Sequence, residues 1–179
     1  MTGVSASASG EYVLYWMTAF RRAGHNFALQ RAVDWCVELG KPLVVLEAVR
    51  AGYPWASDRF HGFILDGMAD NAARFARAGV LYLPCLEPHR GAARGLFASL
   101  AARACVVVTD DYPASFHPSA IAAASQQSAA LVEKVDSNGL LPMRTPGRSF
   151  TSARFFRLFL QRNLLNHLVF PADDPLAGR

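Results

Sequence analysis

The chain has 179 residues, of which 52% are hydrophobic and 18% are charged. This composition excludes an intrinsically disordered or collagen-like protein, and no apolar run approaches the about 20 residues of a membrane span. The net charge of +4 comes from a basic set in which all but two residues are arginine, and so small an excess is weak evidence for a nucleic-acid partner. Three cysteines without a CxxC motif favour a reducing, cytoplasmic compartment.

Residues 1–11 are small and mostly polar, and they predict a disordered tail rather than a secretion signal, because a basic segment and an apolar segment are both missing. Five short apolar runs follow, each typical of a strand buried on both faces. These runs cover 12–17, 42–47, 80–83, 105–109 and 131–135. Helical patterns separate the runs, between Asn26 and Gly40, between Ser57 and Gly79, from Gly91 to Arg103 and from Pro118 to Gln127.

Strands that alternate with helices indicate an α/β protein with a parallel sheet covered on both faces. Right-handed crossovers then predict a five-stranded, doubly wound, Rossmann-like sheet with strand order 3-2-1-4-5. Its switch point falls between the first and the fourth strand. Ligands of such sheets bind beyond the carboxyl ends of the strands, so we expect any site at that edge.

Residues 136–179 depart from this pattern. Turn signals at Asn138-Gly139 and Pro146-Gly147 predict a loop over 136–147. A helix is predicted over 151–167, with apolar residues around most of its circumference, so we expect burial on more than one side. Five arginines and no acidic residue lie between 144 and 166, and these arginines are candidates for contact with DNA phosphates or with a neighbouring domain.

Familiar catalytic and nucleotide-binding motifs are missing, among them the Walker A, GxGxxG, GxSxG and HExxH patterns. The sharpest polar feature at the strand ends is Asp110-Asp111, which could bind a metal ion or a ribose hydroxyl, or could cap a turn. Glu47 could also meet a ribose hydroxyl. The pair Arg21-Arg22 could hold an anion, or could be a solvated surface pair.

Several segments together resemble the DNA photolyase and cryptochrome family, and most closely the class II DNA photolyases. The resemblance rests on Tyr15-Trp16-Met17 followed by Arg22, Asn26, Ala28 and Leu29, and on the segments 41–46, 107–110 and 135–142. The chain departs from the class II pattern at two places on the ligand edge, at Ala19-Phe20 and at Asp111-Tyr112-Pro113.

The resemblance implies that residues 12–143 form the antenna domain of a photolyase and that 144–179 form a connecting helix and tail. The photolyase helical domain, which binds FAD and damaged DNA, would then be a partner that this chain lacks. The antenna domain can hold a deazaflavin, a flavin or a folate, and we expect neither catalytic residues nor a metal ligand here. Candidate chromophore contacts are Met17, Arg22, Asn26, Glu47, Asp110, Asp111 and Asp136.

Two other functions fit the sequence. One is a stand-alone nucleotide-binding module that resembles the universal stress proteins, against which the missing glycine-rich loop counts. The other is a structural role, in which Phe155, Phe156 and Phe159 dock the domain to a helical partner or to a second copy of the chain.

Overall fold

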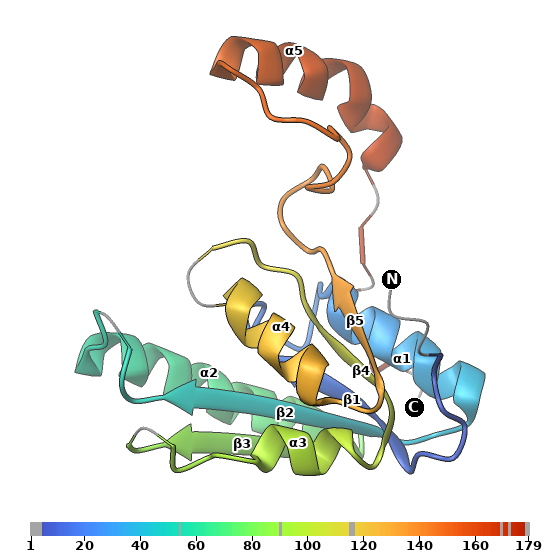
Figure 1. The fold of residues 1–179 in the computed structure, drawn as a ribbon, viewed down its shortest axis with the longest axis vertical. Helices are drawn as coiled ribbons and strands as arrows, with labels where there is room; N and C mark the ends of the chain where they lie inside the picture. Colours follow the sequence, from blue (N-terminus) through green and yellow to red (C-terminus); the bar gives the residue numbers. More distant parts are fainter. Residues whose placement is uncertain are drawn as a thin grey trace.

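The computed structural model describes residues 5–53, 55–89, 91–114, 117–168, 170–171 and 173–177. Five strands form one parallel sheet in the order β3-β2-β1-β4-β5 (Figure 1), which confirms the predicted fold class and strand order. The strands are β1 (Tyr12–Met17), β2 (Leu43–Arg50), β3 (Leu81–Glu87), β4 (Ala104–Asp110) and β5 (Leu131–Val135). The helices are α1 (Phe27–Leu39), α2 (Asp58–Arg77), α3 (Leu96–Ala101), α4 (His117–Gln127), α5 (Ala153–Asn163) and the 3-10 helix η1 (Leu164–His167).

Helices cover both faces of the sheet, as Figure 1 shows. Successive side chains of a strand point to opposite faces, so β1 serves two cores at once. Val13, Tyr15 and Met17 pack with α1 and α2, whereas Leu14 and Trp16 pack on the side of α3. This division of β1 into two faces decides which of its residues can reach a ligand.

The helix signals of the sequence are mostly confirmed. Asn26 caps α1 by accepting a hydrogen bond from the backbone N–H of Leu29 (3.0 Å), and Gly40 ends that helix in the left-handed conformation, with φ of 62°. Ser57 caps α2 in the same way. The side chains of Asn26 and Ser57 satisfy backbone N–H groups that the first helical turn leaves without partners.

Among the elements that differ in length from their predictions are α3 and β3. The helix expected from Gly91 shrinks to α3, because Gly91 and Gly95 both take positive φ values that an α-helix does not allow. The third strand instead runs on through Pro84 to Glu87. Proline is tolerated there because β3 is the edge strand of the sheet, where one side needs no hydrogen-bond partner.

Part of the segment predicted as a disordered tail crosses the start of β4. The backbone N–H of Ser7 donates to the carbonyl of Cys105 (2.9 Å), and that of Glu11 donates to the carbonyl of Arg103 (2.8 Å). Gly10 lies so close to β4 that a Cβ atom would stand 2.4 Å from the backbone nitrogen of Cys105. Residues 1–4 of the predicted tail lie outside the described residues.

A Gly10→Ala variant is therefore expected to lose about 2 kcal/mol of unfolding free energy, because rigid backbone atoms have to move. Gly62→Ala provides the matched control, since Gly62 lies in α2 with nothing near its missing Cβ. This control should gain about 0.5–1 kcal/mol from helix propensity. Urea denaturation measures both changes, and equal stability of the two variants would contradict the close crossing.

After β5 the chain leaves the sheet, and we call residues 136–143 the connector and residues 144–168 the arm. The arm carries α5, which stands away from the sheet (Figure 1). No described side chain of α5 is buried, so the expected burial on more than one side is not found. Phe156 and Phe159 contact the ring of Phe150, at 5.4 and 5.2 Å between ring centroids. Phe155 is 57% exposed.

Beyond the arm the chain returns to the α/β core. Leu176 is buried in the core cluster that includes Ala23 and Phe75. The carbonyl of Asp173 passes so close to Gly24 that a Cβ atom there would stand 2.7 Å from its oxygen. Both ends of the arm are therefore held by the same domain. No helix within the described residues is both long enough and apolar enough to cross a membrane.

Candidate ligand-binding cleft

A cleft of about 450 Å³ opens at the carboxyl edge of the sheet. It lies between the N-terminal part of α2, at Ile64, and the start of α4. Aromatic rings and small aliphatic side chains line most of it, with cationic groups among them. Its described lining residues are Trp16, Tyr53, Tyr112, Arg21, Arg50, His117, Thr18, Ala19, Ala48, Val49, Ile64 and Ala120. None of these carries an acidic side chain. The position at the strand ends matches the edge at which the sequence predicted a site.

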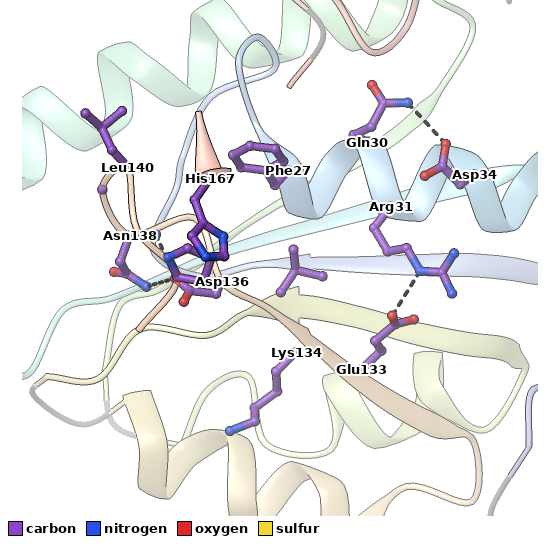
Figure 2. A pocket seen from close by; sticks show the side chains of 13 residues that line it. Phe27, Gln30, Arg31, Asp34, Glu133, Lys134, Asp136, Asn138, Leu140 and His167 are labelled. Atoms are coloured by element: carbon purple, nitrogen blue, oxygen red, sulfur yellow. Dashed lines mark hydrogen bonds and ion pairs between the residues drawn. The ribbon is translucent and has the colours of Figure 1, made fainter. Parts of the chain in front are cut away.

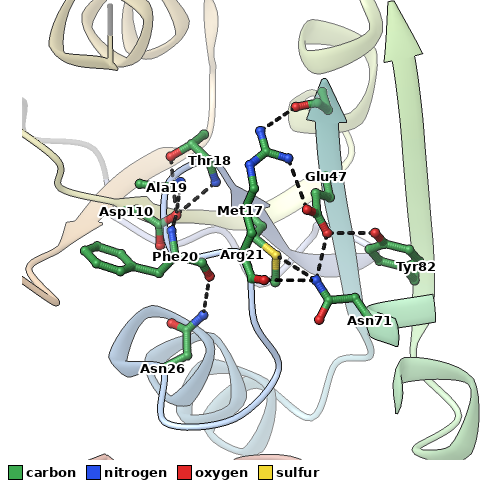
Figure 3. Close-up of polar contacts among 11 residues, drawn as sticks. Met17, Thr18, Ala19, Phe20, Arg21, Asn26, Glu47, Asn71, Tyr82 and Asp110 are labelled. Atoms are coloured by element: carbon green, nitrogen blue, oxygen red, sulfur yellow. Dashed lines mark hydrogen bonds and ion pairs between the residues drawn. The ribbon is translucent and has the colours of Figure 1, made fainter. Parts of the chain in front are cut away.

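Asp110 holds the turn that forms one wall of the cleft. Its carboxylate is buried and accepts hydrogen bonds from the backbone N–H groups of Thr18 (2.9 Å), Ala19 (2.7 Å) and Phe20 (3.1 Å), as Figure 3 shows. Its other oxygen accepts from the hydroxyl of Tyr15 (2.9 Å). Asp110 thus caps a turn, but the turn follows β1 rather than β4. Both of its carboxylate oxygens already accept hydrogen bonds from groups of the protein.

Glu47 is the centre of a second buried network, also drawn in Figure 3. Its carboxylate accepts hydrogen bonds from Arg21 Nη1 (3.0 Å), Asn71 Nδ2 (3.0 Å) and the hydroxyl of Tyr82 (2.7 Å). Arg21 also donates to the carbonyl of Ala48 (2.7 Å). The guanidinium of Arg21 is therefore fixed at the edge of the cleft, and the carboxylate of Glu47 balances its charge. It can orient a ligand through its N–H groups more than it can attract one by net charge.

Two tyrosines in these networks make the folded state less stable at alkaline pH. Burial, together with the carboxylate of Asp110, raises the pKa of Tyr15, and burial with the hydrogen bond to Glu47 raises the pKa of Tyr82. A pKa raised by folding gives stability that is complete below the ordinary tyrosine pKa of about 10 and is lost as pH rises above it.

We therefore expect the urea midpoint to fall between about pH 9.5 and about pH 11.5, where only the unfolded chain releases these protons. Tyr82→Phe should start from a lower midpoint, because it loses the bond to Glu47, and then decline less steeply with pH. An identical slope in the variant would contradict a raised pKa for Tyr82.

None of the seven predicted contact residues is among the described residues that line the cleft. Met17, Glu47 and Asp110 point to the face of α1 and α2, whereas the cleft opens on the face of Trp16. Asn26 is buried, caps α1 and donates to the hydroxyl of Tyr15. Met17, Glu47 and Asp110 therefore lie at the same edge of the sheet as the cleft, but on the other face of the strands.

The other three predicted residues make contacts outside the cleft lining. Arg22 donates to the carbonyl of His25 and is exposed. Asp111 pairs with Lys134 and Arg144 (both 3.3 Å). Asp136 closes the connector turn by accepting from the backbone N–H of Asn138 and Met143.

A second cavity of about 480 Å³ lies between α1, β5 and the connector (Figure 2). Its charged side chains are largely paired with one another. Arg31 donates to Glu133 (2.9 Å), and Gln30 donates to Asp34 (3.2 Å). Among the described residues no group of three or more His, Cys, Asp or Glu side chains could hold a metal ion. The cleft at the carboxyl edge is thus the better candidate site.

Sequence reasoning missed most of the cleft lining, although it identified Arg21 as a residue that could hold an anion. Trp16 reads as a core residue, and it does contact Phe97 at 4.6 Å between ring centroids. Its position one residue before the strand end, on the face opposite Met17, was the available signal. Ile64 and Ala120 come from helices, and only the three-dimensional arrangement brings them to the strand ends.

The fold and the cleft define a doubly wound α/β domain with a ligand-sized, aromatic-lined cleft at its topological switch point. The chain is similar to a deoxyribodipyrimidine photo-lyase from Methanothermobacter thermautotrophicus, with 26% identity over 170 residues. That alignment covers 94% of this chain, and the chain spans 37% of the length of that relative. No protein-family model matches the sequence.

Solved structures give weaker matches. The universal stress protein from Archaeoglobus fulgidus in complex with dAMP is 12% identical with a TM-score of 0.44, and covers 69% of this chain and 96% of its own. A universal stress family protein from Burkholderia pseudomallei is 17% identical with a TM-score of 0.40, over 70% of this chain and 96% of its own. Both scores are low, so neither match carries a conclusion about this chain.

Proposed function

We propose that this chain is the light-harvesting α/β part of a photolyase-like protein of the class II type. The observation that carries the proposal is the similarity to a deoxyribodipyrimidine photo-lyase along 94% of the chain. In this proposal residues 12–143 form the antenna domain, and residues 144–179 form the link to the helical domain that binds FAD and damaged DNA. Repair of pyrimidine dimers would belong to the whole protein, and the chain alone would be inactive.

The cleft is the proposed site of the antenna chromophore, which would be a deazaflavin, a flavin or a folate. Its volume lies within the range of small-molecule sites, about 300–1,000 Å³, and its lining suits a planar ring. Trp16 and Tyr112 offer aromatic surface, and the fixed guanidinium of Arg21 offers a directed donor at the rim. The bound chromophore would absorb light and pass on its excitation. The protein's task is then to hold a ring in one orientation and to exclude water, which needs no general acid, base or nucleophile.

Titration with a deazaflavin, FMN and a folate tests the proposal, with ATP as the comparison for a nucleotide-binding module. We expect one of the three chromophores to bind at micromolar concentration. Ala120→Trp fills the cleft from α4 and should weaken binding at least about tenfold, about 1.4 kcal/mol. Ala122→Trp is the matched control, because Ala122 lies on the same helix and is exposed. Binding of ATP alone, or equal loss in both variants, would contradict an antenna site.

The arm is the proposed contact with the helical domain. Its exposed side chains combine large apolar residues with arginines that have no acidic partner among the described residues, with the exception of Arg144. Replacing Phe155 and Phe156 by serine should reduce self-association of the isolated chain in analytical ultracentrifugation and leave its thermal midpoint within a few degrees. A large drop in the midpoint would instead assign these residues to the core of this chain.

A further inference from the structure

Three consecutive residues at the end of β4 each hold a different part of the molecule. Asp110 holds the turn after β1 through three backbone N–H groups. Tyr112 lines the cleft. Asp111, between them, holds the connector and the first residue of the arm. The cleft and the arm therefore meet at one short segment of backbone.

The contacts of Asp111 come from its backbone as well as from its side chain. Its N–H donates to the carbonyl of Val135 (2.8 Å), and its carbonyl accepts from Asn138 Nδ2 (2.6 Å). Its carboxylate accepts from Lys134 Nζ and from Arg144 Nη2, each at 3.3 Å. The Asp111 side chain is 16% exposed, whereas that of Arg144 is 78% exposed. The carboxylate of this pair is thus mostly buried, whereas its guanidinium is open to solvent.

Among the described residues, the ring of Tyr112 is in contact with two other rings. It meets Phe20 and His117 edge-on, at 6.2 and 5.2 Å between ring centroids. Edge-on contacts between rings are favourable over centroid distances of about 4.5–7 Å, so they fix the position of Tyr112 only loosely. The backbone of Asp111 is then the firmest point from which the position of Tyr112 is set.

We propose that Asp111 is a positioning residue that couples the cleft to the arm: the connector and Arg144 fix Asp111, and Asp111 fixes Tyr112 in the cleft wall. This inference rests on the proposed function of the cleft for its ligand, but the coupling itself exists without one. A ligand that packs on Tyr112 favours one arrangement of Asp111 and so restrains the arm. By linkage, restraint of the arm changes ligand affinity by the same factor.

Hydrogen exchange of the ligand-free chain tests the coupling by itself. Arg144→Ala removes the arm's ion pair with Asp111, and we expect exchange in residues 110–114 to rise about threefold. Arg148→Ala is the matched control, because Arg148 lies over the ring of Phe150 in the arm (5.3 Å) and has no contact with Asp111 among the described residues. Equal exchange in residues 110–114 of both variants would overturn the proposal.

A second measurement uses FMN or a deazaflavin as the probe. Binding to the wild-type chain should slow exchange in α5. Asp111→Asn should abolish this slowing and shift the fluorescence of the bound probe, while the thermal midpoint falls by no more than a few degrees. Glu133→Gln is the control on β5, since Glu133 pairs with Arg31 on the opposite face. If α5 responds equally in wild type and Asp111→Asn, the coupling is wrong. If no probe binds, the antenna function fails while the ligand-free exchange still decides on the coupling.

Discussion

Asp110→Asn is expected to lower the free energy of unfolding by about 3 kcal/mol. The buried carboxylate accepts from three backbone N–H groups and a tyrosine hydroxyl. An amide offers only one oxygen to these four donors and presents N–H groups to the rest, so at least one donor loses its acceptor. Hydrogen bonds to a charged group contribute about 1.5–3 kcal/mol each, and an unsatisfied buried donor costs about 1–3 kcal/mol.

The neighbouring substitution Asp111→Asn is the matched control for stability. It makes the same chemical change one residue away, at ion pairs with exposed partners, and should cost less than about 1 kcal/mol. Urea unfolding followed by circular dichroism measures both. Comparable losses in the two variants would show that the turn after β1 is not held by Asp110.

Glu47→Ala is expected to cost about 3–4 kcal/mol. The substitution leaves the guanidinium of Arg21, the amide of Asn71 and the hydroxyl of Tyr82 without their shared acceptor. Removal of one member of a buried ion pair typically costs about 3–5 kcal/mol, because the remaining charge stays desolvated. Arg21 is 25% exposed and can turn toward water, which places the expected loss at the lower end of that range.

A double-mutant cycle with Arg21→Met separates the ion pair from the rest of the Glu47 network. The loss from Glu47→Ala should shrink by about 1–2 kcal/mol when Arg21 is already methionine, since the uncompensated charge is then gone. Glu133→Ala is the comparison at a less buried ion pair, that of Glu133 with Arg31. It should lower the free energy of unfolding by about 1 kcal/mol. If Glu47→Ala costs as much in the Arg21→Met background as in the wild type, the ion pair is not the main cause of the stability loss.

Local patterns were enough to predict the sheet. The run from Tyr12 to Met17 has no polar residue, and it forms the central strand, which is buried on both faces. Gly40 and Asn26 mark the ends of α1, because a left-handed φ and a side-chain acceptor are local requirements that few residues meet. Strand order then followed from the handedness of the crossovers.

The site was less predictable because its chemistry depends on contacts between distant segments. Asp110 and Glu47 looked like ligand groups, since both are acids at strand ends. Their donors lie about 90 and about 25 residues away along the chain, and no periodicity shows that such partners exist. The same limit applies to the exposed side chains of α5, because amphipathicity indicates two faces but does not show whether either is covered.

The return of the chain to the α/β core has a consequence for how the arm can vary. With Leu176 seated beside Ala23, the connector, the arm and the segment after it form a closed loop rather than a free end. The entropy cost of closing a loop rises only with the logarithm of its length, about 0.6 kcal/mol for each doubling. Insertions or deletions in the arm should therefore leave the sheet folded, provided that the chain can still pass Gly24 as closely as it does at Asp173. The arm is the part of this molecule in which length is free to change.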